Sequence, residues 1–314
     1  MSGSVSSRFS GTSRSRGPVG AHKGRVSRAG TKPALKGVSV VVPAKNEAKN
    51  IGWVLRRLPE VDEVILVDGQ STDGTVAVAR GIVPNLLLVN EERPGKGAAL
   101  RAGFEAASGD YVVMLDADGS MDPSEISRYV AMLQSGYDLV KGSRFMPGGG
   151  TADISPLRRL GNRGLLMLAN GLYGTDFTEL CYGFMAFRRS CLEDMALASD
   201  GFEIETEIVV NSLRAGLRVG EVPSFESPRR YGESNLNTFR DGFRVLGTMV
   251  KARFAGPTRP QVERPARGRE AGASEPVPVG PPLARGRLAL SVTLGLTALA
   301  PMAAILGLRM LGVS

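Results

Sequence analysis

The chain has 314 residues, a net charge of +8 and a hydrophobic fraction of 42%, enough apolar sequence for one sizeable globular domain. Its single histidine, His22, lies in a polar basic tail, and its only cysteines are Cys181 and Cys191. This composition excludes Ser-His-Asp and Cys-His nucleophilic sites, histidine-based zinc sites and a disulfide framework. Any catalysis must therefore use carboxylates, lysine, arginine, hydroxyls, backbone amides or a hard metal ion.

The positive charge lies at the two ends of the chain. Residues 1–36 contain eight Lys and Arg and no acidic residue, and six more Arg lie in 257–287. Residues 37–256 hold 24 basic and 28 acidic residues, so their net charge is −4. A nucleic acid is therefore not an expected partner.

The first segment, residues 1–36, is rich in Ser, Gly and Arg and has no hydrophobic period. Such a composition buries too little apolar surface to fold, which predicts a disordered basic arm. The segment also lacks the apolar stretch of a signal peptide.

Residues 37–254 alternate between two patterns. Short β-rich runs at 38–42, 63–67, 85–89 and 111–115 are separated by helical spacing near 48–58, 73–80, 96–107 and 123–134. This alternation predicts an α/β domain, Rossmann-like, with a mainly parallel central sheet and helices on both faces. Such sheets bind ligands at the carboxyl ends of their strands.

Polar residues follow the first three predicted strands. Pro43 is expected to end the first strand, before Asn46 and Glu47, which either bind a ligand or simply cap a helix. Asp68 ends the second strand, where a base or ribose would be held. Lys96, between two glycines that let backbone approach a ligand, offers a cation to a phosphate near a helix start. Neither a P-loop nor a dinucleotide-binding glycine motif is present.

Asp116 and Asp118 follow the fourth predicted strand. Two carboxylates separated by one residue repel each other unless a cation lies between them, and their hard oxygens suit Mg²⁺ or Mn²⁺. Solvated aspartates on a surface turn are the alternative. The three polar loops that come before favour a metal that holds a diphosphate.

Two later segments, 157–174 and 237–254, combine apolar residues at helical spacing with surrounding arginines and lysines. This pattern is typical of a helix lying on an anionic membrane surface. A helix packed on the sheet gives the same pattern, and the sequence leaves both possibilities open.

The C-terminal region begins with a Pro-, Gly- and Arg-rich stretch, 255–287, which we interpret as a linker. Residues 288–308 then run for 21 positions without a charge, about the length of a membrane-spanning helix. An apolar helix packed on the domain is the alternative. Arg285 and Arg287 come just before this segment and would keep the folded domain at the cytoplasmic face.

The chain resembles the family 2 glycosyltransferases of the GT-A fold in an ordered series of motifs: VVVPAKNEAKNI, ILVDGQSTDGT, RPGKGAALRAGF, VVMLDADGSMDP and VKGSRF. Its ending, CYGFMAFRR followed by EVPSFESPRRYGESNLN, is similar to the branch of dolichol- and polyprenyl-phosphate mannosyl- or glucosyltransferases. The resemblance covers residues 38–254.

The resemblance implies a role for each matching residue. The nucleotide pocket would be lined by Pro43, Asn46, Glu47, Asp68 and Lys96. The metal and diphosphate would be bound by Asp116 and Asp118. The phosphate of a lipid acceptor would be faced by Arg144, Arg158, Arg229 and Ser234, and arginine suits this role because its fork of N–H donors grips phosphate oxygens.

Three departures from that branch concern the acceptor more than the donor. Ser120 stands where Gln is frequent, Ser234-Asn235 where Ser-Lys is found, and Glu179 where Asp is usual. A phosphate acceptor is already an anionic nucleophile, whereas a hydroxyl acceptor needs a general base, for which Glu179 is the candidate.

We therefore expect a metal-dependent inverting enzyme that moves mannose or glucose from GDP-mannose or UDP-glucose to polyprenyl or dolichyl phosphate, using Mg²⁺ or Mn²⁺. Its catalytic residues would be Asp116, Asp118, Arg144 and Glu179. A hydroxyl acceptor on a glycan or small metabolite stays open as an alternative. A second alternative is a non-catalytic basic protein that binds membranes or nucleic acid.

Overall fold

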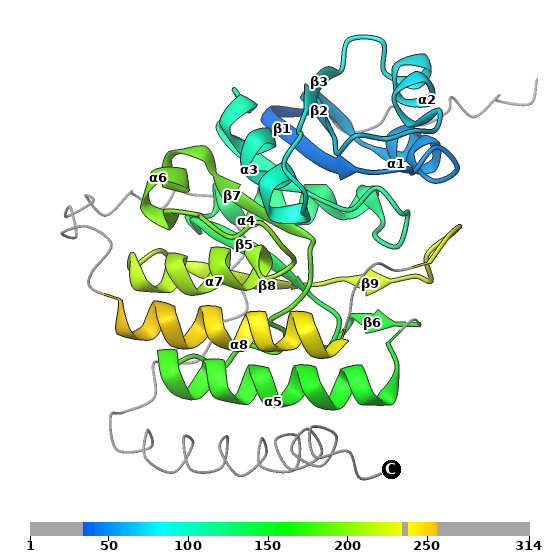
Figure 1. Ribbon diagram of the computed structural model, residues 1–314. Coiled ribbons are helices and arrows are strands. Elements are labelled where there is room, and N and C mark those ends of the chain that lie inside the picture. Colours follow the sequence, from blue (N-terminus) through cyan, green and yellow to red (C-terminus); the bar gives the residue numbers. More distant parts are fainter. Residues whose placement is uncertain (1–33, 153, 234–237, 256–314) are drawn as a thin grey trace, which may run out of the picture. The chain divides into compact units, whose positions relative to one another are not determined.

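A seven-stranded sheet forms the centre of the domain (Figure 1). The computed structural model describes residues 34–152, 154–233 and 238–255. The strand order is β3-β2-β1-β4-β7-β5-β8, and a separate two-stranded sheet is formed by β6 and β9. The strands are β1 Ala34–Ala44, β2 Glu60–Asp68, β3 Leu87–Asn90, β4 Tyr111–Met114, β5 Leu139–Ser143, β6 Gly150–Thr151, β7 Met185–Arg188, β8 Val219–Pro223 and β9 Phe225–Glu226.

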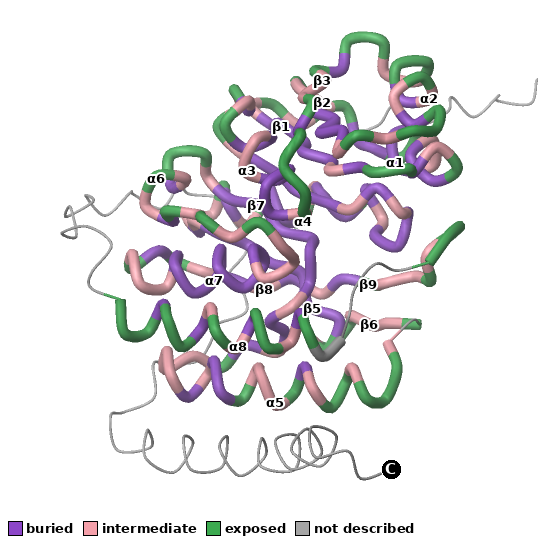
Figure 2. The backbone as a smooth tube through the Cα atoms, in the orientation of Figure 1, coloured by how far each residue is buried: buried purple, intermediate pink, exposed green. Residues whose placement is uncertain are grey.

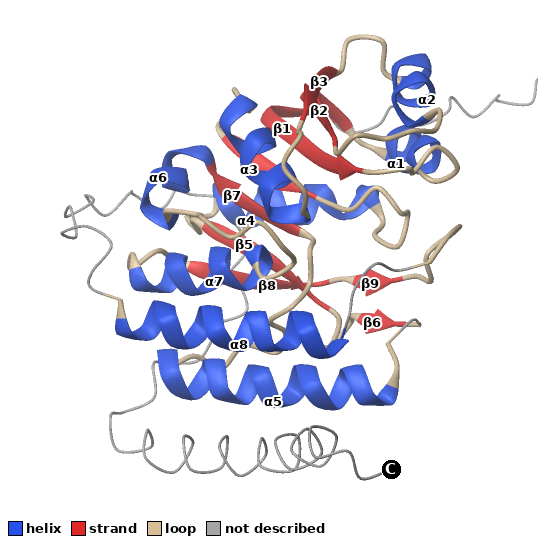
Figure 3. Ribbon diagram, in the orientation of Figure 1, coloured by secondary structure: helices blue, strands red, loops and turns tan. Residues whose placement is uncertain are grey.

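The helices alternate with these strands (Figure 3). They are α1 Ile51–Arg57, α2 Thr75–Ile82, α3 Lys96–Ala106, α4 Ile126–Gln134, α5 Pro156–Tyr173, α6 Leu192–Met195, α7 Ile204–Arg214 and α8 Thr238–Phe254. Short 3₁₀ turns at Pro123–Glu125 and Arg189–Cys191 come directly before α4 and α6.

The sheet is mainly parallel, as the alternation predicted. Strands β1, β2, β3 and β4 pair in parallel, and so do β5 and β8. Only β7, among the described strands of this sheet, runs antiparallel to its two neighbours. Because β7 runs the opposite way, its first residue lies beside Met114, so the loop that enters β7 reaches the edge where β4 ends.

The central strands of the sheet are mostly buried (Figure 2). Both faces of the sheet are covered, because successive side chains of a strand point to opposite faces and each set packs in its own core. Val40 and Val42 of β1 pack in one core with α1 and α4, while Val41 packs in the other with α3, α5, α7 and α8. Val112 and Val113 of β4 divide between the two cores in the same way. This two-sided burial is the expected consequence of crossover helices on a parallel sheet.

Two predicted boundaries differ from the structure. Pro43 does not end β1, because the strand continues to Ala44 and Pro43 is in register with Val67 of β2. The pairing of β1 with β4 stops at Val41, so Pro43 has a strand on one side only, a position that proline tolerates. At the other end, β1 starts at Ala34, inside the segment predicted as a disordered arm.

Helix α8 packs against α7 and α5 (Figure 1). Val245, Met249 and Ala252 are buried, and the Tyr173 hydroxyl donates to the Met249 carbonyl at 2.8 Å. The packed-helix interpretation of 237–254 therefore holds for one face of α8, while Phe243, Val250 and Phe254 stay exposed on it.

None of the helices in 34–152, 154–233 and 238–255 combines the length and the apolar character needed to cross a bilayer. Most of the basic arm, the linker from residue 256 and the segment 288–308 lie outside the described residues.

The close packing of α3 on the sheet predicts that a glycine-to-alanine substitution in this helix destabilises the protein, although alanine normally favours a helix. A Cβ at Gly103 would lie 2.4 Å from Val41 Cγ1 and 2.8 Å from Val67 Cγ2, whereas one at Gly164 of α5 would meet open space. We expect Gly103→Ala to lower the free energy of unfolding by about 1–3 kcal/mol through overpacking. Gly164→Ala should raise it by about 0.5–1 kcal/mol. Urea denaturation of both variants tests this, and equal effects would contradict the predicted close contact.

Candidate active site

The loops after β1 and β2 are tied together at the carboxyl edge of the sheet. The Asn46 amide donates to Ser71 Oγ at 2.9 Å, and the Thr72 amide donates to Asn46 Oδ1 at 2.8 Å. The Glu47 amide donates to Thr75 Oγ1 at 2.8 Å. Asn46 adopts a left-handed backbone with φ of 58°, which asparagine accepts more readily than most residues. Asn46 and Glu47 thus join the loop after β1 to the loop after β2.

Asp68 has a carboxylate oxygen that the protein leaves without a donor. Its Oδ2 accepts from the Ser71 amide at 3.0 Å, while its buried Oδ1 has no hydrogen-bond partner among the described residues. Leaving such an oxygen unpaired is costly. An N–H or O–H group of a bound ligand would satisfy it, so Asp68 fits the predicted nucleotide pocket.

The carboxylates of Asp116 and Asp118 are each neutralised by a cation from a distant part of the chain. Lys96 Nζ lies 2.6 Å from Asp116 Oδ1 and 2.7 Å from Glu205 Oε1. Arg229 Nη1 lies 3.5 Å from Asp118 Oδ2, and its Nη2 donates to Glu47. The structure therefore brings Lys96 to Asp116, and Arg229 to Asp118 and Glu47. The resemblance implied a nucleotide pocket for Lys96 and Glu47 and an acceptor phosphate for Arg229, and did not imply these ion pairs.

Burial and charge act against each other in this cluster. Burial disfavours the Lys96 ammonium, but Asp116 and Glu205 outweigh it and raise the pKa of Lys96 above its ordinary value. Burial, with the charges of Asp118 and Glu205, raises the pKa of Asp116 to about 6, against the lowering effect of Lys96. Lys96 thus remains a cation beside Asp116.

The donor set suits a hard divalent cation that arrives with its ligand. Asp118 Oδ1 accepts from the Ser120 amide at 2.9 Å and from Ser120 Oγ at 2.7 Å, which orients this carboxylate. Within the part of the chain that the structure describes, no three His, Cys, Asp or Glu side chains form a metal cluster. Asp116 and Asp118 would hold Mg²⁺ or Mn²⁺ with phosphate oxygens and water as the remaining ligands.

Glu205, in the first turn of α7, was missed by the sequence analysis. It is one of three glutamates at alternate positions in FEIETEI. Acidic residues are common in the first turn of a helix, so this pattern does not indicate a partner on α3. Its carboxylate shares Lys96 with Asp116. It lies so close to Gly183 that a Cβ there would be 2.7 Å from Glu205 Oε1.

The glycines on either side of Lys96 have a different function from the predicted one. The Gly97 amide donates to the Asp200 carbonyl at 2.7 Å. A Cβ at Gly95 would lie 2.1 Å from that carbonyl oxygen, and one at Gly97 would lie 2.2 Å from the Ser199 carbonyl oxygen. These glycines therefore allow two chain segments to approach each other, and the start of α3 is covered by protein instead of facing a phosphate.

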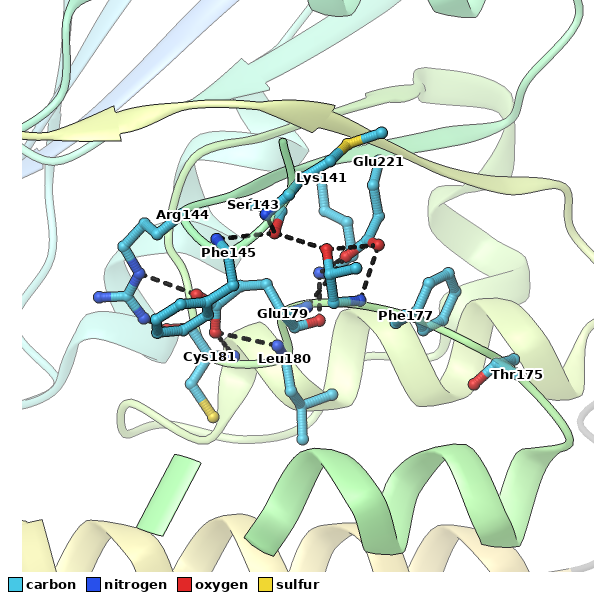
Figure 4. Close-up of polar contacts among 12 residues, drawn as sticks. Lys141, Ser143, Arg144, Phe145, Thr175, Phe177, Glu179, Leu180, Cys181 and Glu221 are labelled. Atoms are coloured by element: carbon cyan, nitrogen blue, oxygen red, sulfur yellow. Dashed lines mark hydrogen bonds and ion pairs between the residues drawn. The ribbon is translucent and has the colours of Figure 1, made fainter. Parts of the chain in front are cut away.

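Glu179 is fully buried in a polar network (Figure 4). Its Oε2 accepts from Arg144 Nε at 2.8 Å. Its Oε1 accepts from Asn162 Nδ2 at 2.9 Å and from the Leu180 amide at 3.0 Å. A carboxylate with both oxygens engaged and no exposure is poorly placed to take a proton from an acceptor hydroxyl, so the structure does not support the general-base role.

Arg144 also differs from its predicted place at an acceptor phosphate. Besides Glu179, which lies beside it in Figure 4, its guanidinium binds Glu226 at 2.9 Å and the Cys181 carbonyl at 2.9 Å, and the residue is buried. Burial opposes its charge, but the two glutamates raise the pKa of Arg144 above its ordinary value. In this arrangement Arg144 joins the end of β5 to the loop before β7 and to β9, and its fork faces protein.

The remaining residues predicted to bind the acceptor phosphate lie in different parts of the structure. Arg229 lies at Asp118 and Glu47, while Arg158 lies in the first turn of α5, where Ser155 caps the helix by accepting from the Arg158 amide at 3.3 Å. Ser234 lies outside the described residues.

Burial raises the pKa of the Cys181 thiol to about 12, which agrees with a site that does not use cysteine.

The chain is similar to one family model and to several known proteins. A model of glycosyl transferase family 2 matches residues 39–196. Glycosyltransferase AglJ of Haloferax volcanii is 36% identical over 219 residues, which cover 67% of this chain and 70% of AglJ. The polyprenol monophosphomannose synthase of Mycolicibacterium smegmatis is 32% identical over 214 residues, which cover 63% of this chain and 80% of that protein.

Solved structures show the same fold. Glucosyl-3-phosphoglycerate synthase from Mycobacterium tuberculosis, in complex with Mn²⁺, UDP-glucose and phosphoglyceric acid, is 28% identical with a TM-score of 0.56, covering 69% of this chain and 79% of that one. Its complex with Mn²⁺, UDP and glucosyl-3-phosphoglycerate is 26% identical with a TM-score of 0.55, covering 68% and 79%. The predicted family is confirmed: the chain belongs to glycosyl transferase family 2 and is a glycosyltransferase of the GT-A fold.

Proposed function

We propose that this glycosyltransferase moves mannose or glucose from a nucleoside-diphosphate sugar to a polyprenyl-type lipid phosphate, with inversion at the anomeric carbon. The observation that carries the proposal is the placement of Arg229, 3.5 Å from Asp118 and bonded to Glu47. The Arg229 guanidinium therefore lies beside the carboxylates that would hold the donor. An incoming phosphate could replace those carboxylates as its partner.

The donor half of the proposal rests on three features. Asp68 offers an unpaired buried oxygen to the nucleoside, and the loops after β1 and β2 are tied together by hydrogen bonds at the same edge of the sheet. Asp116 and Asp118 would hold Mg²⁺ or Mn²⁺, which supplies charge to the departing diphosphate. The Mycobacterium tuberculosis synthase, solved with Mn²⁺ and UDP-glucose, supports a nucleotide sugar with a divalent cation. Assays with GDP-mannose and with UDP-glucose distinguish the two donors.

The acceptor half rests on the burial of Glu179. A hydroxyl acceptor needs a base at the site, and the carboxylate predicted for that role is saturated by Arg144, Asn162 and backbone amides. A lipid phosphate brings its own anionic oxygen and needs little base. The relative that synthesises polyprenol monophosphomannose supports the same acceptor class.

A lipid acceptor requires a membrane, and α5 and α8 present suitable surfaces. Their exposed apolar residues are Leu157, Leu160, Met167, Phe243, Val250 and Phe254. Their exposed basic residues include Arg159, Arg163, Arg244, Lys251 and Arg253, and Asp241, the one acid within either helix, is buried. Apolar and basic side chains together suit anionic headgroups. We propose that these helices dock the enzyme at the cytoplasmic face of the membrane.

Removing the two aspartates should abolish metal-dependent transfer. We expect Asp116→Asn/Asp118→Asn to lower turnover by about a hundredfold or more and to eliminate the response to Mg²⁺ or Mn²⁺. The assay measures nucleoside diphosphate released from GDP-mannose and UDP-glucose with polyprenyl phosphate present. Asp122→Asn, which alters the cap of the following 3₁₀ turn, is the matched control. Unchanged turnover and cation dependence in the double variant would refute the donor assignment.

The acceptor class is tested by a pair of matched lipids. Wild-type enzyme should glycosylate a polyprenyl phosphate and leave the polyprenol of the same chain length unmodified, because only the phosphate supplies an anionic nucleophile. Arg229→Lys, which keeps the charge and loses the fork, should raise KM for the phosphate about tenfold with a smaller change in donor KM. Preferred transfer to the alcohol would favour the hydroxyl alternative.

Membrane docking predicts an effect that depends on how the acceptor is presented. Arg159→Glu/Arg163→Glu on α5 should raise KM for polyprenyl phosphate embedded in anionic vesicles by about tenfold or more, at about 1 kcal/mol for each basic residue. KM for a short-chain acceptor in detergent should not change. Arg80→Glu on α2, an exposed arginine of a helix that packs on α1, is the control. Equal effects of both charge reversals would contradict docking through α5.

A further inference from the structure

Residues 227–233, called the strap here, follow β9 and cross the loop that carries Asp118. The Ser227 amide donates to the Ser120 carbonyl at 2.8 Å, and the Arg230 amide donates to the Asp118 carbonyl at 3.4 Å. Asn50 Nδ2 donates to the Tyr231 carbonyl at 3.0 Å. No residue of the strap is buried, so the strap has no apolar core of its own to hold it in place.

The side chain of Arg230 lies on the ring of Trp53, with 4.7 Å between its guanidinium carbon and the ring centroid. Trp53 belongs to α1, and Arg57 of the same helix also lies over the ring, at 4.6 Å. Gly119, with φ of +75°, lies beneath this stack. A Cβ on Gly119 would be 2.8 Å from Arg230 Cδ and 3.3 Å from Trp53 Cε3. The stack is therefore packed directly against the loop of the metal-binding aspartates.

The neighbouring Arg229 turns to a different set of partners. Its Nη groups reach Asp118 and Glu47, and its Nε donates to the Tyr231 carbonyl at 2.9 Å. Because Arg229 and Arg230 are adjacent in the chain, fixing Arg230 on the ring also limits where Arg229 can go. The attraction between a guanidinium and an indole face suits this purpose, since it is strongest for tryptophan and persists at a partly exposed surface.

We propose that Trp53 is a positioning residue for sugar transfer: its ring holds Arg230, and through it the strap, so that Arg229 stays at Asp118 and Glu47 and is ready for the acceptor phosphate. The identity of Arg229's ligand rests on the proposed function, whereas the anchoring of the strap does not. Trp53 contacts neither of the aspartates through a hydrogen bond or ion pair described here, so it acts through Arg230.

The test compares Trp53→Leu, Trp53→Phe, Arg230→Ala and Arg57→Ala in the full chain. Trp53→Leu and Arg230→Ala should each raise KM for polyprenyl phosphate about three- to tenfold, with kcat and donor KM changed less than about twofold. Trp53→Phe, which keeps an aromatic face, should recover most of the loss. Combining Trp53→Leu with Arg230→Ala should add nothing to either single effect, because both remove one contact.

Arg57→Ala is the matched control. It also removes a guanidinium from the ring of Trp53, the only tryptophan of the chain, so Arg57→Ala and Arg230→Ala should both shift the fluorescence emission. Only Arg230→Ala releases the strap, so only this variant of the two should alter acceptor KM. Equal rises of KM in the two variants, or none in Trp53→Leu, would overturn the proposal.

A readout without substrate separates this inference from the proposed function. Hydrogen exchange in a peptide covering 227–233 should be faster in Trp53→Leu and Arg230→Ala than in wild type and Arg57→Ala, because the Ser227 and Arg230 amides lose their carbonyl partners. Faster exchange in a protein that does not glycosylate polyprenyl phosphate would refute the proposed acceptor and support the anchor. Unchanged exchange would refute the anchor whatever the acceptor is.

Discussion

The site depends on one electrostatic constraint, the crowding of carboxylates at the carboxyl edge of the sheet. Glu47, Asp116, Asp118 and Glu205 converge there, and their charges are opposed by Lys96 and Arg229. Each cation is shared between two carboxylates, which offsets the repulsion among the carboxylates. A metal that arrives with a diphosphate would compete with Lys96 and Arg229 for the carboxylates of Asp116 and Asp118.

A second polar network, further from the aspartates, supports the first. Arg144, Glu179 and Asn162 connect the end of β5 with the loop before β7 and with α5. Lys141 is fully buried and bonds Glu221 at 2.9 Å and the Glu179 carbonyl. Buried charges persist only when each is paired, so the segment 176–183 is held tightly. The last residue of this segment, Gly183, lies against Lys96 and Glu205.

The antiparallel strand β7 explains how these networks meet. Parallel strands end at the ligand-binding edge, whereas β7 begins there, beside Met114. The loop before β7 is therefore brought to the end of β4 although it lies about seventy residues later in the chain. A helix-strand alternation that continued as a purely parallel sheet would place this loop at the opposite edge.

Much of this organisation was predictable from local patterns. The first four strands and the helices between them lie close to the predicted ranges, because alternation and helical spacing act over a few residues. The polar residues at the strand ends, from Asn46 to Asp118, were identified because a parallel sheet places such positions at one edge. Pro43 was misjudged because a strand paired on one side accepts proline, and the sequence does not reveal which strand is missing a neighbour.

The sequence by itself determined the fold class, the family and the residue types available for chemistry, since one histidine in a tail and two aspartates after a strand are visible without coordinates. Only the tertiary structure decided the partners: Lys96 with Glu205 across 109 positions, Arg229 with Glu47 across 182, and Arg230 with Trp53. It also decided that Arg144 and Glu179 face each other inside the protein. Such pairings depend on the order of strands in the sheet and on the paths of distant loops, which no local spacing encodes.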